Sequence, residues 1–455
     1  MVLLHNHFVP GQGWLALLVA GIILIVAVGC QTAPQVGEIN QASLTVEATA
    51  TLPPVKTPTV ATTPTITATH TPENEVITLT FWTVEQISPK AEGELGSFMT
   101  SSLRAFEVKN PDIEVKLLLK KASGKGGVLD FLRTAREVAP SILPDILIMN
   151  ATELDQAYTE GLIQTLDDRL DRSVVQDLLP AARKMGTVNE RLVGVPLGLE
   201  MEHTVYNAGI FAETPVLWTE VLSSNTRYLF PAKGTNGLVN DATLSQYFSA
   251  GGAFRNDQGT LKIDDQVLRD VLTFYQQALE KQIIDTSILE AATTEELWST
   301  YLDGKAGLTQ ISVRQYLTDR ESLNNTTFTL LPVQDKKDTP VAITHGWTLV
   351  LVTNDINRQR SALRLIEWFL STSNNATWNN LNKSIPARDT AFQQLAGDDP
   401  YWAFLTEQLN TAQPQPGFTG YDQVGRIIQQ AVEQVIRGEV TPDQATTTAV
   451  DALTP

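Results

Sequence analysis

The chain has 455 residues, 42% of them hydrophobic and 18% charged, so it can bury two or three globular cores. It carries 33 Lys and Arg against 51 Asp and Glu, a formal net charge of −18. This balance excludes a protein that binds nucleic acid by neutralising phosphates, and it disfavours adhesion to anionic lipid. The one cysteine, Cys30, excludes an intramolecular disulfide and a cysteine-based zinc site.

The N-terminal segment predicts a lipoprotein signal peptide over residues 1–29. Its apolar run, WLALLVAGIILIVAVG (14–29), contains no charge and is followed at once by Cys30. This run is shorter than the about 20 residues of a membrane span and has the size of a signal-peptide core. The segment resembles the lipobox of bacterial lipoproteins, in which the cysteine is lipidated and becomes the mature N-terminus. An uncleaved signal anchor is the alternative, and both place the rest of the chain outside the cytoplasm.

Residues 30–75 predict a disordered tether. Between Thr45 and Thr71 the sequence is dominated by Thr and Pro, which cannot bury apolar area and which restrict the backbone. Such a segment between a lipid anchor and a folded unit leaves that unit free to move above the bilayer. We therefore expect the folded part of the protein to begin at residue 76.

From residue 76, strand patterns alternate with helix patterns. VITLTFWT alternates apolar and polar residues, whereas ILIM is a continuous apolar run typical of a strand buried on both faces. The expected strands include 76–83, 113–119 and 146–149, and the expected helices include 95–106, 131–138 and 424–436. This order predicts an α/β fold whose ligand crevice lies beyond the carboxyl ends of the strands.

A series of segments in chain order resembles the extracellular solute-binding proteins of family 1, the carbohydrate-binding subunits of ABC importers. The segments are LTFWT (79–83), FEVKNPDIEVK (106–116), PDILIMNATELDQAYTEGLIQTLD (144–167), VGVPLGLEMEHTVYNAGIF (193–211), WTEVL (218–222), AGGAF (250–254), YLDGKAGLTQI (301–311), HGWTLVLV (345–352), IPAR (385–388) and IRGEVTPDQA (436–445). The resemblance implies a two-lobed, periplasmic-binding-protein-like α/β fold of type II. Its lobes are discontinuous in sequence and are joined by crossing strands.

Mapped onto this chain, the resemblance implies lobe one from residues 76–195 and 327–372. Lobe two then takes residues 196–326 and 373–455. Pro196 ends an apolar strand at the expected first crossing, and the strand Phe328–Pro332 is the expected return crossing.

Sugars are bound by stacking on aromatic rings and by hydrogen bonds to carboxylates, amides and Arg. The resemblance implies such contacts where strands end. Glu85 and Gln86 follow the first expected strand, Asn150 and Thr152 follow ILIM, and Glu200 follows the first crossing. A solvated hinge charge is the alternative for Glu200.

Further ligand-binding candidates lie in the second half of the chain. Arg314 and Tyr316 follow the strand where relatives place an aromatic from lobe two, and the guanidinium can serve either hydroxyls or an anionic group. Trp347 can cover a sugar face or pack beneath the cleft. Phe418 and Tyr421 follow a Pro-rich turn and can close the cleft from lobe two.

No catalytic, metal or cofactor motif is found. The glycine-rich stretch 123–127 lacks the first Gly and the Ser or Thr of a phosphate-binding loop. The chain has no HExxH spacing for a metal and no GxSxG or SxxK nucleophile motif. We therefore expect neither enzyme activity, nor a cofactor, nor a metal.

The resemblance implies the substrate-binding lipoprotein of an ABC importer, which captures a carbohydrate or related polyol between its lobes and delivers it to the permease subunits. We expect a monomer that is anchored by lipid to the outer face of the cytoplasmic membrane. Two alternatives remain: an extracellular lipoprotein glycoside hydrolase, which needs two carboxylates across the scissile bond, and a sensory co-receptor with the same fold. The sequence leaves the identity of the sugar open.

Overall fold

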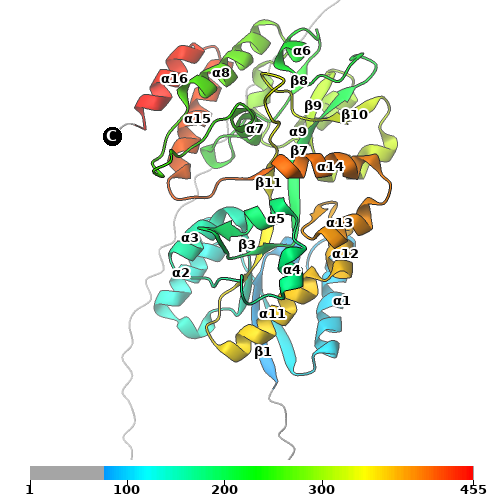
Figure 1. The fold of residues 1–455 in the computed structure, drawn as a ribbon, viewed down its shortest axis with the longest axis vertical. Helices are drawn as coiled ribbons and strands as arrows, with labels where there is room; N and C mark the ends of the chain where they lie inside the picture. The colour runs from blue at the N-terminus through cyan, green and yellow to red at the C-terminus, as the bar shows by residue number, and fades with distance from the viewer. Residues whose placement is uncertain (1–75, 454–455) are drawn as a thin grey trace, which may run out of the picture. The chain divides into compact units, whose positions relative to one another are not determined.

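Two β-sheets, each covered by helices, make up the part of the chain that this computed structural model describes, residues 76–453 (Figure 1). The expected signal peptide (1–29), Cys30 and the expected tether (30–75) lie outside the described residues. None of the helices between residues 76 and 453 has the length and apolar character needed to cross a bilayer.

The first sheet has five strands in the order β2-β1-β3-β12-β6. The strands are β1 (Ile77–Thr83), β2 (Ile113–Leu119), β3 (Ile146–Asn150), β6 (Val195–Pro196) and β12 (Trp347–Leu351). The pairs β1–β2 and β1–β3 are parallel, whereas β12 is antiparallel to both β3 and β6. The expected strands at 76–83, 113–119 and 146–149 are therefore confirmed.

Helices bury both faces of this sheet. The helices are α1 (Gly93–Lys109), α2 (Val128–Val138), α11 (Ile356–Leu370) and α12 (Thr372–Asn382). On β1, Phe81 packs against Phe369 of α11 with ring centroids 6.1 Å apart, while its neighbour Trp82 packs against Phe131 of α2 at 5.2 Å. Because successive strand residues point to opposite faces, these contacts place α11 and α2 on opposite sides of the sheet.

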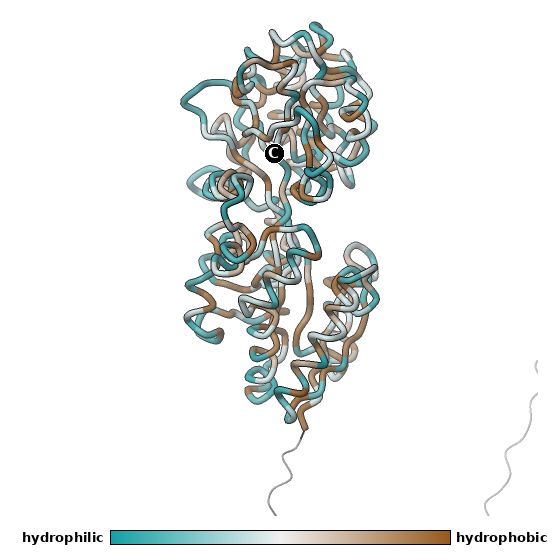
Figure 2. Tube along the Cα trace, turned by 90° about the vertical axis from the view of Figure 1, so that its right-hand side faces the viewer, coloured by the Kyte–Doolittle hydropathy of each residue, from teal (hydrophilic) through white to brown (hydrophobic). Residues whose placement is uncertain are grey.

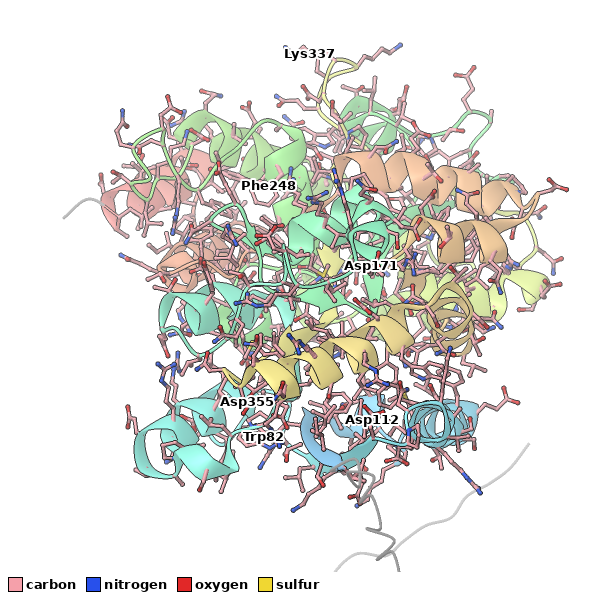
Figure 3. All side chains as sticks on the ribbon, turned by 60° about the horizontal axis from the view of Figure 1, so that its bottom comes forward. Trp82, Asp112, Asp171, Phe248, Lys337 and Asp355 are labelled. Carbon is pink, nitrogen blue, oxygen red and sulfur yellow. The ribbon has the colours of Figure 1, made fainter. Side chains whose placement is uncertain are left out.

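Polar contacts fix α11 at its start and near its middle. Asp355 caps its start, since one carboxylate oxygen accepts from the backbone N–H groups of Asn357 and Arg358 at 2.9 and 3.0 Å. Farther along, Arg364 donates to Asp112 at 2.7 Å, and this hydrogen bond lowers the pKa of Asp112. Figure 3 shows Asp355 and Asp112 beside this helix. Helix α11 therefore has a capped N-terminus, and the bond between Arg364 and Asp112 holds its side in place.

The second sheet is built around one long strand, β7 (Gly198–Asn207). It pairs antiparallel with β9, β10, β11 and β13, and β8 and β14 extend the sheet. These strands are β8 (Tyr228–Leu229), β9 (Leu308–Ser312), β10 (Thr326–Thr329), β11 (Ile343–His345), β13 (Ile385–Pro386) and β14 (Gln413–Pro414). A short hairpin, β4 (Thr187–Val188) with β5 (Arg191–Leu192), stands apart from both sheets.

The remaining helices are short or surround the second sheet. They are α3 (Leu154–Thr159), α4 (Arg172–Gln176), α5 (Pro180–Met185), α6 (Trp218–Leu222), α7 (Asp241–Ser249), α8 (Asp265–Glu280), α9 (Glu295–Leu302), α10 (Val313–Asp319), α13 (Asp389–Ala396), α14 (Pro400–Thr411), α15 (Tyr421–Ile436) and α16 (Pro442–Asp451). Single 3-10 turns are η1 (Glu85–Ile87), η2 (Pro140–Ile142), η3 (Ala151–Glu153), η4 (Thr235–Gly237), η5 (Thr286–Leu289) and η6 (Arg320–Ser322). Helices α8, α15 and α16 pack on one another (Figure 1).

Hydrophobic residues run along the strands and inner helix faces, and hydrophilic residues gather on the outer loops (Figure 2). One large core lies around the first sheet and extends to part of the second, and another lies among β8, α7, α8 and α15. In the latter, Trp218 stacks on Phe274 with centroids 4.8 Å apart and donates to Gln246 at 2.8 Å.

The first crossing lies where it was expected, and the second does not. The chain leaves the first sheet at Pro196 and enters the second at Gly198. The expected return at Phe328–Pro332 is wrong, because Phe328 pairs with Val205 inside the second sheet. The return lies at Gly346, between β11 of the second sheet and β12 of the first.

This correction moves both lobe boundaries in the second half of the chain. Residues 327–345 belong with the second sheet, although they were expected in lobe one. Helix α12, which was expected in lobe two, packs on α1 and α11 of the first sheet. A strand that ends in Pro looks the same in sequence at a sheet edge and at a crossing, and only its pairing partner distinguishes the two.

Candidate functional site

Five of the predicted ligand residues line one cavity of about 730 Å³, which we call the Trp347 cavity. They come from four elements on both sheets: η1, β7, α10 and the start of β12. The five residues are Glu85, Gln86, Glu200, Arg314 and Trp347. Segments far apart in the sequence thus contribute polar and aromatic side chains to one space.

The turn after β1 holds Glu85 and Gln86 toward solvent. The buried Thr83 hydroxyl donates to the carbonyl of Ile87 at 2.5 Å, and Ser88 donates to the carbonyl of Glu85 at 2.8 Å. These bonds satisfy the backbone of the turn, so both side chains remain exposed and available to a ligand.

Arg314 and Glu200, which both line the Trp347 cavity, form an ion pair. The guanidinium also donates to the side-chain oxygen of Asn382 on α12 at 3.0 Å. Both ionic side chains are 45% exposed, so solvent screens the pair and the contact is a positioning device more than a source of stability. The charge of Arg314 is therefore matched within the protein.

Trp347 is half-buried at the return crossing, directly after Gly346. A Cβ atom at Gly346 would lie 2.7 Å from the Met185 sulfur and 2.8 Å from the Gly198 carbonyl oxygen, so only glycine fits. This close approach sets where β12 starts and hence where the Trp347 ring lies.

Sequence reasoning missed a second tryptophan in this cavity, Trp378 of α12. Its side chain is 6% exposed, and its indole N–H has no hydrogen-bond partner among the described residues. The assignment of α12 to lobe two concealed its closeness to Glu85. The only signal in the sequence is an aromatic residue among the asparagines of SNNATWNN.

The other predicted residues, except Tyr316, line a separate cavity of about 740 Å³, the Thr152 cavity. Asn150 ends β3 and Thr152 lies in η3, whereas Phe418 and Tyr421 come from the loop and the helix start after β14. The Asn150 side-chain oxygen accepts from the Thr152 backbone N–H at 3.0 Å and from its hydroxyl at 2.8 Å. The hydroxyl of the buried Tyr421 has no partner among the described residues.

Glu153 also lines the Thr152 cavity and was not predicted. One of its carboxylate oxygens is buried without a partner in the described structure. Burial raises the pKa of Glu153 to about 7, although the nearby Arg133 opposes this.

Tyr316 lines none of these cavities. It is buried beside Tyr401, with ring centroids 4.3 Å apart, and meets the edge of His203 at 5.4 Å. This aromatic cluster joins α10 to α14 and β7, so the structure places Tyr316 in the core.

The loop that carries Phe418 rests directly on η3. A Cβ atom at Gly417 would lie 2.1 Å from the Thr152 carbonyl oxygen. The Thr419 backbone N–H donates to Asp155 at 3.2 Å, and Arg255 donates to the Thr419 carbonyl at 3.1 Å while lying 4.3 Å from the Phe418 ring. This loop therefore links segments from both sheets beside the Thr152 cavity.

A smaller space of about 190 Å³, the inner cavity, adjoins the Thr152 cavity through Thr235, Leu238 and Gln415. Its polar wall includes Glu202 on β7, Asp241 at the start of α7 and His345 on β11. His345 Nε2 lies 2.5 Å from an Asp241 carboxylate oxygen. Burial opposes the charge of His345, but Asp241, Glu202 and Glu200 outweigh it and raise its pKa to about 9.

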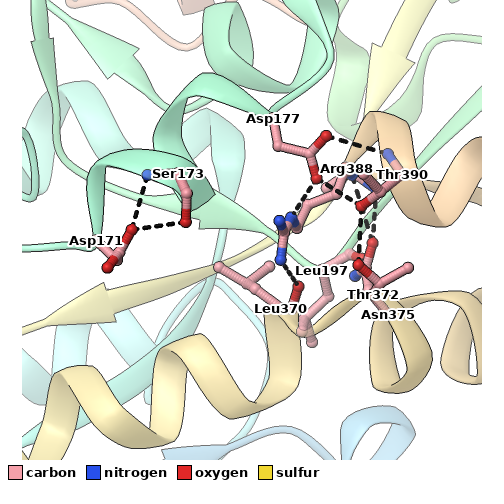
Figure 4. A network of polar contacts seen from close by, with 10 residues as sticks. Asp171, Ser173, Asp177, Leu197, Leu370, Thr372, Asn375, Arg388 and Thr390 are labelled. Carbon is pink, nitrogen blue, oxygen red and sulfur yellow. Dashed lines mark hydrogen bonds and ion pairs between the residues drawn. The ribbon is translucent and has the colours of Figure 1, made fainter.

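A polar network holds the first crossing in place (Figure 4). Asn375 of α12 donates to the Leu197 carbonyl, in the crossing itself, at 2.6 Å. Arg388 donates to Asp177 at 2.7 Å and to the Leu370 carbonyl at 2.8 Å. The Asn375 side-chain oxygen also accepts from the backbone N–H groups of Ala387 and Arg388 at 3.1 and 3.4 Å, so the crossing is tied to α12 directly and to the start of α13 through Asn375.

Within residues 76–453, no group of three or more His, Cys, Asp or Glu side chains is arranged to hold a metal ion. The chemistry of the cavities is that of carboxylates, amides, one guanidinium and aromatic rings, which are side chains that hydrogen-bond and stack on polyols.

Comparison with known proteins gives a family and a fold. Residues 102–403 match the family described as bacterial extracellular solute-binding protein. No curated protein sequence matches the chain.

Solved structures of similar fold include sugar-binding proteins. The cyclic alpha-maltosyl-1,6-maltose binding protein from Arthrobacter globiformis has a TM-score of 0.68 at 18% identity, covering 83% of this chain and 98% of that one. The sugar-binding protein MalE from Xanthomonas citri has a TM-score of 0.67 at 18% identity, with 83% and 97% covered. A solute binding protein from Thermotoga lettingae bound with alpha-D-tagatose has a TM-score of 0.64 at 20% identity, with 83% and 98% covered. These likenesses confirm the expected two-lobed α/β fold.

Proposed function

The chain belongs to the bacterial extracellular solute-binding proteins, and we propose that it captures a carbohydrate or related polyol between its lobes for an ABC importer. The observation that carries this proposal is the Trp347 cavity. Glu85 and Trp347 reach it from the first sheet, and Glu200 and Arg314 reach it from the second. A solute held there touches both lobes, and only such a solute favours one arrangement of the lobes over another.

The lining of the Trp347 cavity fits a sugar. Its volume of about 730 Å³ lies within the range of small-molecule sites. Trp347 and Trp378 offer aromatic surface, while Gln86, Asn382 and the carboxylates offer hydrogen-bond partners for hydroxyls. One protein of similar fold is named for binding cyclic alpha-maltosyl-1,6-maltose and another is bound with alpha-D-tagatose, which supports the same class of solute here.

The charges favour a neutral polyol over a phosphorylated one. Four glutamates line the Trp347 cavity against two cations, Lys90 and Arg314. Arg314 is already paired with Glu200, so an anionic solute would have to displace that carboxylate. A neutral hydroxyl group can instead bond to the pair without separating it.

Family membership places the protein outside the cytoplasm. We propose that Cys30 carries a lipid anchor at the outer face of the cytoplasmic membrane, with residues 30–75 as the tether. The folded unit then acts as a monomer that presents its solute to the permease subunits and leaves the solute chemically unchanged.

The test is a thermal-shift panel on the purified full chain with D-glucose, maltose, D-tagatose, sorbitol and glucose 6-phosphate. A solute at about 100 times its Kd stabilises the folded state by about 2.7 kcal/mol, which gives a clear shift. We expect at least one neutral sugar or polyol to raise Tm and to be recovered unchanged after incubation. A shift with glucose 6-phosphate alone, no shift with any compound, or cleavage of maltose would contradict the proposal.

A further inference from the structure

Of the two carboxylates that line the inner cavity, Asp241 is bonded to His345, whereas no hydrogen bond from residues 76–453 reaches the side chain of Glu202. It is half-buried on β7, opposite Ser312 of β9. Its carboxyl lines the inner cavity of about 190 Å³ on one side and a space of about 10 Å³ beside Gln310 and Gln408 on the other. A carboxylate in such a position usually accepts hydrogen bonds from protein donors, and no donor within residues 76–453 bonds to this one.

Charged and titratable groups face Glu202 from every neighbouring element. They are Asp241 on α7, Glu295 on α9, His345 on β11, Tyr228 on β8, Glu200 on its own strand and Lys233 at the inner cavity. The cations among these groups and the cation Arg314 of the Trp347 cavity are already engaged or solvated. His345 is bonded to Asp241, Arg314 is paired with Glu200, and Lys233 is exposed to solvent.

The balance of these groups favours the protonated form of Glu202. Burial removes water from the carboxylate, and the like charges of Asp241 and Glu295 add to this, while His345 opposes it. Together they raise the pKa of Glu202 to about 8. This direction favours the neutral carboxyl, which can donate a hydrogen bond, at the wall of a cavity large enough for part of a sugar ring.

We propose that Glu202 is a proton-bearing specificity residue, whose neutral carboxyl donates a hydrogen bond to a hydroxyl of the solute in the inner cavity. Capture then requires that one proton stay on Glu202. The part of this proposal that concerns the solute rests on the proposed function, whereas the protonated state of the carboxyl does not.

The direction in which sugar affinity changes with pH follows from the protonated and the ionised forms of Glu202. Below about pH 8 the neutral carboxyl donates to a hydroxyl, and above it the carboxylate can only accept and adds a third negative charge beside Asp241 and Glu295. Affinity for a neutral sugar therefore falls as the pH rises through about 8. If only the protonated form binds, Kd is about fourfold higher at about pH 8.5 than at about pH 6.5.

The first measurement is ¹³C NMR of the full chain labelled at the glutamate carboxyl carbons, titrated without any sugar. We expect one carboxyl with a midpoint near pH 8 that is absent from Glu202→Gln. Glu295→Gln is the matched control, since this neighbouring carboxylate accepts from Ser312 at 2.7 Å and does not line the inner cavity. It should keep the signal, with its midpoint moved to lower pH.

The second measurement is the Kd of D-glucose, maltose and D-tagatose at about pH 6.5 and about pH 8.5. We expect the rise in Kd in the wild type and no change with pH in Glu202→Gln, whose amide keeps a donor in either buffer. A Glu202 midpoint below about pH 6 overturns the proposal whichever sugar binds. The same pH dependence in Glu202→Gln as in the wild type also overturns it. A panel without any binding counts against the proposed function, while the carbon titration still decides the state of Glu202.

Discussion

Trp347 is the aromatic residue on which recognition of a sugar depends most directly. Its half-buried ring lines the Trp347 cavity beside Glu200 and Arg314. We expect Trp347→Ala to weaken binding of the sugar found in the panel by about 2- to 13-fold, because a lost aromatic stacking contact costs about 0.5–1.5 kcal/mol. Isothermal titration calorimetry on the full chain measures this change.

Trp368 provides the matched control for this substitution. It is another half-buried tryptophan, but its indole N–H donates to Ser102 at 3.0 Å and it lies outside the cavities. Trp368→Ala should lower stability and leave the sugar affinity unchanged. Equal affinities in the wild type and Trp347→Ala would remove Trp347 from the site.

Sequence reasoning found cleft residues that stand beside a strand end or a crossing. Glu85 follows β1, Glu200 lies just after the first crossing, and both line the Trp347 cavity. Tyr316 is different because it lies three residues after the buried Val313 on α10, and that spacing returns it to the core side of the helix. Glu202 could not be distinguished from a surface charge, since only the fold shows what surrounds a carboxylate in the middle of a strand.

At the scale of elements, the strands of the first sheet could be predicted because their patterns are local. The alternation in β1 and the apolar run of β3 each predict a strand correctly without knowledge of the strands that they pair with. The return crossing could not be predicted in this way, because its position depends on whether Phe328 pairs with β7 or with the first sheet. Pairing is a long-range property that periodicity does not encode.

The ion pair of Arg388 with Asp177 is the part of the crossing network most sensitive to substitution. Its side chains are only 12% and 16% exposed, so loss of the guanidinium leaves a poorly solvated carboxylate and an unpaired carbonyl. We expect Arg388→Met to lower the free energy of unfolding by about 2–4 kcal/mol, measured by urea denaturation.

Lys305→Met is the matched control, because its partner Asp303 and the lysine itself are 59% and 65% exposed. This exposed pair should contribute less than about 1 kcal/mol. A loss of the same size in both variants would show that the Arg388 network does not hold the crossing.

At the scale of the whole molecule, the attachment at Cys30 decides how the folded unit is held. We expect the wild type expressed in bacteria to incorporate labelled palmitate and to lack residues 1–29 by mass spectrometry. Cys30→Ser should incorporate no label and keep those residues, because the thiol that accepts the lipid is missing. Ser43→Ala, in the expected tether, is the control and should behave as the wild type. An unlabelled wild type that keeps residues 1–29 would instead show an uncleaved signal anchor.

The central place of β7 has a consequence for the time at which the chain can fold. Its partners β9, β10, β11 and β13 come from residues 308–386. The first sheet is likewise incomplete until β12, residues 347–351, has been synthesised. Neither sheet can be completed until most of the polypeptide has been synthesised, and pairing between such distant segments is slow. A protein of this extracytoplasmic family must be exported. We expect this order of strands to delay folding on the inner side of the membrane, so that the chain is still extended when it is translocated.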